Sequence, residues 1–523
     1  MFRTAVAWLL PAGFDEVYYY LYSRHLSWSY FDHPAMVAVT TGVGWWLTTF
    51  ITPLTIRLGA LGLYTLSLVL LYLTAERLFD RQTGILTIAI ACISPLIWLT
   101  FGVLTSPDNG LIYFWTLSLL IATYEFMPAQ WSALAPAPAL NYRPTCRIVL
   151  LGLTLGLTCL SKYHGFILGL GLVGFCATRA RTRSALWSPW TALSLMVFCI
   201  TLIPLWLWNS QNDWISFRFH LFLRFDGGNP SPYRILDALG TWLLGLVYLF
   251  PTLGIPLWLS TWQALGQQIR DWIQPPITEA EAVARDRTAL ILWVSLPIAL
   301  GFTLLGGKQA IYPAWPAPGF WGLTLLLAHA AQHWQPRLVR RWLMGTGLMI
   351  STLITLALLH LSLGVLQKPG NYSLFGGFVA PHQDGSTALL DVEQLRSRAA
   401  KSPELIQAWQ ETQFIFTDEY YLSAYVDMAL HPLTSHPITC FSQDPRGFAF
   451  WDEPEAWVGQ EALYITLASL HPDRTALTAE FQPFFQTLEP LQEIPLTRGG
   501  TVTETVLVYQ TTAMQQPYSY PYP

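Results

Sequence analysis

Charge is the scarcest property of this 523-residue chain, because Asp, Glu, Lys and Arg make up only 11% of it. That is less than half of the roughly 25% found in soluble domains. The net charge of −4 provides no basic footprint for nucleic acid, and the six cysteines fit neither a disulfide framework nor a zinc site. With 53% hydrophobic residues, the composition indicates an integral membrane protein that binds no nucleic acid.

The apolar segments predict an α-helical polytopic membrane protein with about 11 transmembrane helices. Residues 1–13 are expected to form a short anchored helix, although their early arginine is also typical of a signal peptide. Residues 34–50 carry Trp45 and Trp46 and are expected to lie along the membrane interface. Further spans are expected at residues 58–76, 84–101, 109–126, 147–161, 163–177, 187–208, 235–260, 289–305, 313–331 and 342–366.

Basic residues are distributed unevenly between the two sets of connecting loops. One set holds 13 arginines, whereas the opposite set holds seven basic residues over longer segments. The positive-inside rule places the richer set in the cytoplasm. The alternation of spans then puts six ionisable residues together on the extracytoplasmic side of the plasma membrane: Asp15, Asp32, Asp108, Lys162, His220 and Lys308.

The composition becomes more polar after about Gln367, which predicts a membrane domain over residues 1–366 and an extracytoplasmic α/β domain over residues 367–523. Within the second domain we expect a strand over residues 414–416, a cap at Asp418-Glu419 and a helix over residues 420–430. Two further stretches, residues 463–467 and 501–509, are expected to be β-strands. The final Pro/Tyr-rich residues predict an extended, disordered tail.

The densest group of ionisable residues lies in FDEVYYYLYSRHLSWSYFDHPAMVA, residues 14–38. Ionisable groups beside membrane segments are costly to place and mark functional sites. Asp15-Glu16 opens the aromatic run and Asp32-His33-Pro34 closes it. This pattern resembles the first extracytoplasmic loop of the polyprenyl-phosphate-sugar-dependent glycosyltransferases of GT-C fold, the group of protein mannosyltransferases and aminoarabinose transferases. The family pattern is Asp-Glu-x-x-Tyr-Tyr and then Tyr-x-(Asp/Glu)-(His/Lys)-Pro-Pro, and this chain departs from it at Ala35.

The resemblance implies a role for each of these residues. Asp15 would be the general base, Glu16 would support substrate binding, Asp32 would contribute to substrate or metal binding, and His33 would approach phosphate. The residues alone leave plainer interpretations open. Asp15 is equally well placed to cap a helix from Tyr18 onward, and Asp32 or His33 to cap the helix that Pro34 begins.

Five later residues complete the expected site. Asp108 matches an acidic position of the family, although Ser-Pro-Asp-Asn-Gly is also an ordinary turn and cap sequence. Lys162 has no carboxylate near it in the sequence and is expected to contact phosphate, with snorkelling as the alternative. In the segment 218–228, His220 would orient substrate or bind a metal and Arg224 would bind phosphate, although an amphipathic loop helix fits equally well. Lys308 precedes a Pro-rich span and is the last expected substrate contact.

The sequence therefore predicts an enzyme that moves a sugar, with inversion, from a polyprenyl-phosphate donor to a lipid, glycan or protein acceptor outside the membrane. Such chemistry needs a base for the acceptor proton and cations for the phosphate leaving group. A divalent metal ion, with Asp32 and His220 as ligands, is compatible with the sequence but not required by it. The alternatives are a transporter or flippase without covalent chemistry and a scaffold whose outer domain binds a partner.

Overall fold

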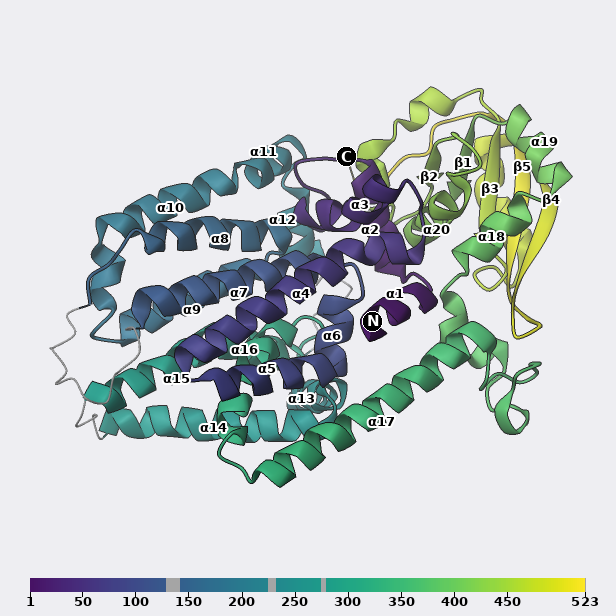
Figure 1. Cartoon of the computed structure of the whole chain (residues 1–523). Helices are drawn as coiled ribbons and strands as arrows, with labels where there is room; N and C mark the ends of the chain where they lie inside the picture. Colours follow the sequence, from purple (N-terminus) through teal and green to yellow (C-terminus); the bar gives the residue numbers. More distant parts are fainter. Residues whose placement is uncertain (128–141, 224–231, 274–278, 523) are drawn as a thin grey trace. The chain divides into compact units, whose positions relative to one another are not determined.

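The computed structural model describes residues 1–127, 142–223, 232–273 and 279–522 (Figure 1). The chain forms two compact units. The first comprises Met1–Asp32, Ala38–Gly59 and Leu353–Pro523, and the second comprises His33–Val37 and Ala60–Thr352. The first unit therefore unites the N-terminal loop with the C-terminal region. Two long helices, α4 (Pro53–Leu78) and α17 (Pro336–Leu363), contribute residues to both units.

The second unit is helical. Within it α8 packs between α7 and α10, and α15 packs against α9 and α16 (Figure 1). Close approach depends on small residues: a Cβ on Gly152 would lie 2.2 Å from the carbonyl oxygen of Ser194. The helices are α5 (Arg81–Ile93), α6 (Pro95–Gly102), α7 (Pro107–Phe126), α8 (Arg147–Ser161), α9 (Gly165–Thr178), α10 (Pro189–Thr201), α11 (Ile203–Gln211), α12 (Ile215–Arg218), α13 (Ile235–Leu249), α14 (Pro251–Ile273), α15 (Glu279–Leu305) and α16 (Ala317–Ala331), with a 3-10 turn η1 (Arg183–Trp187) and a π-helical turn η2 (Phe219–Leu223).

Among the described residues, three helices are long and apolar enough to cross a membrane: α4, the stretch Glu281–Leu305 of α15, and α17. Three pairs, bent by 79° (α5–α6), 44° (α10–α11) and 119° (α13–α14), raise the number to six if each pair is one span. Pro95 and Pro251 begin the second helix of two pairs, because proline fits a first turn but cannot continue a helix. The predicted class, a helical polytopic membrane protein, is confirmed, but the number of about 11 spans is not.

The N-terminal part of the first unit contains α1 (Phe2–Leu9), α2 (Phe14–Arg24) and α3 (Met36–Thr48). The interpretation of Asp15 as a helix cap is wrong, because Gly13 is the N-cap of α2. Helix α3 begins two residues after Pro34. Asp15 is the second residue of its helix, in the first turn, where a negative charge interacts favourably with the helix dipole.

The C-terminal region forms a five-stranded sheet in the order β2-β1-β3-β5-β4. Strands β2, β1 and β3 are parallel to one another, whereas β5 is antiparallel to both of its neighbours, β3 and β4. The predicted α/β class is confirmed, as are the strands and the helix after Asp418-Glu419. The strands are β1 (Phe414–Thr417), β2 (Ile438–Cys440), β3 (Ala462–Leu467), β4 (Phe485–Arg498) and β5 (Thr501–Met514), and the helices are α18 (Val392–Ala399), α19 (Pro403–Glu411), α20 (Tyr420–Leu430), α21 (Phe448–Trp451) and α22 (Arg474–Phe481). Five 3-10 turns are η3 (Leu374–Gly376), η4 (Pro381–Gln383), η5 (Gly385–Ala388), η6 (Pro454–Trp457) and η7 (Gln482–Phe484).

Both faces of the central strands are buried, which explains their continuous apolar sequence. On one face Phe416 stacks with Tyr464 and Phe485, at ring-centroid distances of 4.8 and 5.2 Å. On the other face α20 packs against β1 and β2, and Ser423 of this helix shares a hydrogen bond of 2.7 Å with Thr417. The helix between two parallel strands is the ordinary crossover connection.

The predicted disorder of the tail is wrong. Tyr518 stacks on Phe441 in the core of the sheet, with the ring centroids 4.8 Å apart. The hydroxyl of Tyr520 bonds that of Thr439 at 3.0 Å, and the hydroxyl of Tyr522 accepts the backbone N–H of Arg446 at 2.6 Å. A tyrosine combines a large apolar ring, which can pack in a core, with one polar group that needs a hydrogen bond. The three alternating tyrosines therefore anchor the tail, which its proline-rich composition alone did not predict.

The expected cap at Asp418-Glu419 also differs. Glu419 is the N-cap residue of α20, but its side chain makes no capping hydrogen bond. Asp418 accepts hydrogen bonds from the hydroxyls of Tyr464 and Thr466 and pairs with His471. Asp418 therefore ties the end of β1 to β3 and to the loop that follows β3.

Candidate active site

The acidic pair that opens the N-terminal motif is divided between two environments. Asp15 is exposed, whereas Glu16 is 3% exposed. Glu16 accepts hydrogen bonds from Nε of Arg57 at 2.8 Å and from the N–H of Gly13 at 2.9 Å. Arg57 also donates to carbonyl groups between Ala7 and Pro11. Glu16 thus holds the turn from α1 into α2, and Asp15 is the carboxylate of the pair that a substrate can reach.

Asp32, the second acidic residue of the motif, is buried and contacts Tyr22 and Arg446. It accepts a hydrogen bond from the hydroxyl of Tyr22, and its Oδ2 lies 3.3 Å from Nη1 of Arg446. Tyr22 in turn bonds the hydroxyl of Tyr18 at 3.2 Å, because residues i and i+4 lie on one face of a helix. The aromatic run of the motif therefore lines the side of α2 that holds Asp32.

Arg446 was not found from the sequence. Its guanidinium lies over the ring of Tyr420 at 3.9 Å and pairs with Asp444 as well as with Asp32. Burial lowers the pKa of Arg446, but the carboxylate of Asp32 and its other neighbours raise that pKa above the usual range, so the side chain stays cationic. Arg446 and Asp32 are 414 positions apart, and no local spacing could have connected them.

Asp15 belongs to the same electrostatic neighbourhood. Burial raises the pKa of the Tyr420 hydroxyl, Arg446 lowers it, and the charges of Asp15 and Asp32 raise it again. We call Asp15, Asp32, Tyr420 and Arg446 the Tyr420 cluster. It brings together the two acidic sites that the sequence motif placed 17 residues apart, and it adds one cation from the C-terminal region.

In the second unit the structure joins two other expected residues. Nζ of Lys162, at the end of α8, donates to both carboxylate oxygens of Asp108, at 2.9 and 2.8 Å. Asp108 lies in the first turn of α7, and the amide of Asn109 serves the cap by accepting the N–H of Ser106 at 2.7 Å. The inference that Lys162 lacks a structural partner is therefore wrong, because α7 packs against α8 and its start meets the end of α8.

The remaining expected residues are placed as follows. The rings of His33 and His220 lie 6.0 Å apart, and His220 also contacts the edge of Tyr163 at 5.0 Å. His220 sits in the π-helical turn η2, a kind of turn that is frequent at functional sites. Lys308 is exposed in the turn after α15. Arg224 lies outside the described residues.

No group of three or more His, Cys, Asp or Glu side chains suited to a metal ion exists in the part of the chain that the structure describes. Asp32 and His220, the expected ligands, are not part of such a group, and no step below uses a metal ion.

The fold is of the GT-C type. Over 97% of its length the chain is similar to ArnT from Cupriavidus metallidurans in the apo state, covering 96% of that chain with 16% identity and a TM-score of 0.61. The structure of the same ArnT bound to undecaprenyl phosphate matches with a TM-score of 0.59, 16% identity and the same coverage. Residues 32–208 match the family model of dolichyl-phosphate-mannose-protein mannosyltransferase. No curated protein matches the chain.

These matches confirm the resemblance to the GT-C glycosyltransferase family that the N-terminal motif indicated. The helical fold is that of a multi-pass membrane protein, and residues 32–208 are similar to a glycosyltransferase family. The matched region begins at Asp32 and contains both partners of the Asp108–Lys162 pair.

Proposed function

We propose that the protein is a membrane glycosyltransferase that moves a sugar from a polyprenyl-phosphate donor, with inversion, to a lipid, glycan or protein acceptor outside the plasma membrane. Two findings support the donor class. The family-model match is to an enzyme group whose description includes a dolichyl-phosphate donor, and a structure of similar fold contains undecaprenyl phosphate. The observation that carries the proposal is the Tyr420 cluster, in which an exposed carboxylate lies near a buried, cation-paired one.

Asp15 is the general base in this proposal. Its carboxylate takes the proton from the acceptor hydroxyl while that oxygen forms a bond to the anomeric carbon of the sugar. The bond from this carbon to the lipid phosphate breaks, and the phosphate leaves with the electron pair on the opposite face, which inverts the configuration. Glu16 cannot replace Asp15, because both of its oxygens are engaged by Arg57.

The other residues hold the substrates. Asp32, kept in place by Tyr22 and Arg446, orients the acceptor or the donor sugar. Lys162, Lys308 and Arg224 are the cations assigned to the leaving phosphate, whose negative charge grows as the bond breaks. Asp108 positions Lys162 for this contact, and His33 and His220 orient the donor.

The test is the turnover of purified Asp15→Asn with a polyprenyl-phosphate sugar, compared with the wild type. Loss of a general base typically lowers a rate about 10²–10⁴-fold, whereas the nearly isosteric amide on an exposed position leaves the melting temperature unchanged. Glu16→Gln is the matched control, since it should lower the melting temperature through the loss of a charged partner for Arg57. Near-normal turnover of Asp15→Asn would refute the proposed mechanism.

A transporter or flippase without covalent chemistry is the alternative. Transporters build their sites from broken helices whose ends bind ions and substrates. In the part of the chain that the structure describes, the breaks of the three bent helix pairs fall at Ser94, Leu202 and Phe250, and none of these residues is ionisable. The breaks therefore favour the enzyme, and mass spectrometry of lipid-linked sugars with and without the protein distinguishes the two functions.

A further inference from the structure

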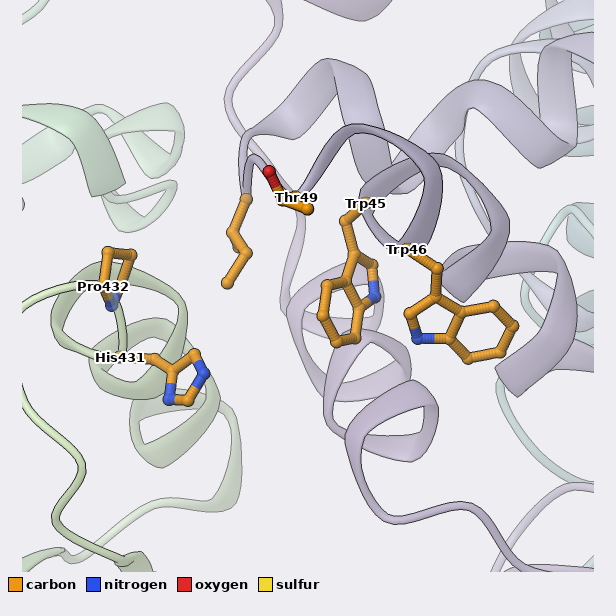
Figure 2. Close-up of a pocket in the computed structure, with 6 residues that line it drawn as sticks. Trp45, Trp46, Thr49, His431 and Pro432 are labelled. Carbon is orange, nitrogen blue, oxygen red and sulfur yellow. The ribbon is translucent and has the colours of Figure 1, made fainter.

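An open pocket of about 380 Å³ lies in the first unit, where the end of α3 meets the end of α20 (Figure 2). None of the Tyr420 cluster lines it. Its volume falls within the range of roughly 300–1,000 Å³ that is usual for small-molecule sites. We call it the Trp45 pocket, and it is lined by Trp45, Trp46, Thr49, Ile51, His431 and Pro432.

The two indole rings are held in place by their own surroundings. Nε1 of Trp45 donates to Oγ of Ser23 at 2.8 Å, and its ring meets the ring of Tyr20 edge-on at 5.8 Å. The ring of Trp46 lies directly over Gly42, where an added Cβ would stand 2.3 Å from the indole. The pocket therefore presents aromatic surfaces whose orientation is fixed before a ligand arrives.

The polar groups of the pocket are uncharged. Figure 2 shows His431 and Trp45 on opposite sides of the pocket, with Thr49 at its edge. Burial lowers the pKa of His431, and Arg24 lowers it further. The neutral imidazole offers one donor and one acceptor, and Thr49 offers a hydroxyl. Such a site suits a ligand with hydroxyl groups better than an anion such as phosphate.

The position of the pocket indicates how a ligand would reach it. One face of α3 exposes Val39, Val43 and Leu47, which are spaced four residues apart, a pattern typical of a helix lying in a membrane interface. The pocket is attached to α2 at Ser23, eight residues after Asp15, which corresponds to about 12 Å along a helix. That distance is too long for the sugar that reacts at Asp15, but it fits a sugar further along the same glycan.

We propose that the Trp45 pocket binds a sugar residue of a lipid-borne acceptor glycan, a residue that is not itself modified. This inference rests on the proposed function. The indole faces cover the apolar face of the sugar ring, and His431 and Thr49 bond its hydroxyls. The open mouth leaves the rest of the glycan hydrated, and the apolar face of α3 accommodates the lipid that bears it.

The experiment is saturation-transfer NMR on the full chain in lipid nanodiscs. The probes are soluble disaccharides of mannose, glucose and N-acetylglucosamine, with phosphocholine as a headgroup that lacks a sugar. We expect at least one disaccharide to bind the wild type, and to bind Trp46→Ala about fivefold to tenfold more weakly. Gly42→Ala keeps every pocket side chain but displaces the ring of Trp46, so it should weaken binding as well. Trp187→Ala, which removes a tryptophan that is 86% exposed and lies outside the pocket, is the matched control.

Failure of the pocket and failure of the enzyme give different results. Binding that is equal in wild type, Trp46→Ala and Gly42→Ala, no binding of any disaccharide, or binding of phosphocholine alone would each overturn the pocket proposal. Asp15→Asn should bind the disaccharide normally. If Asp15→Asn keeps its turnover while Trp46→Ala loses disaccharide binding, the proposed mechanism fails and the sugar-binding pocket stands.

Discussion

Each compact unit of the molecule contains an ion pair that involves a residue of the expected site, and the two pairs are built differently. Asp108 and Lys162 face each other across neighbouring helices, and both carboxylate oxygens lie within 2.9 Å of the same ammonium group. Asp32 and Arg446 are 3.3 Å apart, and each shares its charge with further groups. Asp32 also bonds Tyr22, and Arg446 also contacts Asp444 and Tyr420.

The difference matters for function because Asp108 accepts two of the three N–H donors of the Lys162 ammonium, which leaves one for a substrate, whereas Asp32 and Arg446 each share their charge with several protein groups. The side chains of Lys162 and Asp108 are only 10% and 5% exposed, so the pair is expected to be needed for folding whether or not it meets phosphate. Arg446 is 20% exposed. Its loss should affect Asp32, and through Asp32 the geometry of the Tyr420 cluster, more than it affects the fold.

The largest effect is expected from Lys162→Met. Removing one member of a buried ion pair leaves an uncompensated charge and typically costs about 3–5 kcal/mol of stability. The double variant Asp108→Leu/Lys162→Met removes both charges and should recover most of that loss, since apolar replacement of a whole buried pair is often neutral. Denaturation of the purified variants measures both effects.

The double variant also separates structure from chemistry. If Lys162 stabilises the leaving phosphate, the recovered protein should still transfer sugar slowly and bind donor weakly. A stable double variant with wild-type turnover would show that the pair serves the fold alone. A single variant that is as stable as the wild type would contradict the expectation that the pair is needed for folding.

The next effect is expected from Arg446→Lys, which keeps the charge but loses the planar fork and the stacking on Tyr420. A lysine cannot hold Asp32 and Tyr420 in the same geometry, so we expect slower turnover with a stability loss of about 1–2 kcal/mol. Arg474→Lys is the matched control, because Arg474 pairs with Glu493 at the surface with both side chains more than half exposed. Turnover of Arg446→Lys equal to that of the control would exclude Arg446 as a positioning residue.

The same comparison explains what could be predicted from the sequence. Asp15, Asp32 and the aromatic run form one local pattern, and the strand and helix around Asp418 follow ordinary periodicity. The partner of Lys162 lies 54 positions away, and that of Asp32 lies 414 positions away. Such contacts arise from the packing of whole elements, so the spacing of residues in the sequence does not predict them. The packing of the tail was missed for another reason. Its proline-rich composition is typical of disorder, and composition does not show which residues its tyrosines contact.

The smallest effect is a pH dependence of the C-terminal domain, and it concerns the segment next to the Arg446 network. Asp452 follows Trp451, whose ring stacks on His25 at 4.6 Å and meets Tyr22 edge-on. Burial raises the pKa of Asp452 to about 7, against an ordinary value of 3.8, although the hydrogen bond from Thr439 lowers it. The folded state therefore holds this proton more tightly than the unfolded state does.

The sign of the effect follows from proton linkage. Between about pH 4 and 7 the unfolded state binds fewer protons at Asp452, so the free energy of unfolding falls as the pH rises through this window, by at most about 1.4 kcal/mol per pH unit.

His471 acts in the same direction at higher pH. The hydrogen bond to Asp418 is the main cause of its raised pKa, and its stabilising contribution is lost as the pH rises through the folded-state pKa. Asp452 and His471 should therefore lower the melting temperature of the wild type as the pH rises from 5 to 8, whereas His431, whose pKa is lowered in the fold, acts in the opposite direction. Asp452→Asn should remove the part of the slope below pH 7 and leave that of His471, because the amide keeps the acceptor for Thr439 but cannot titrate. An identical slope in both proteins would mean that Asp452 is ionised in the fold.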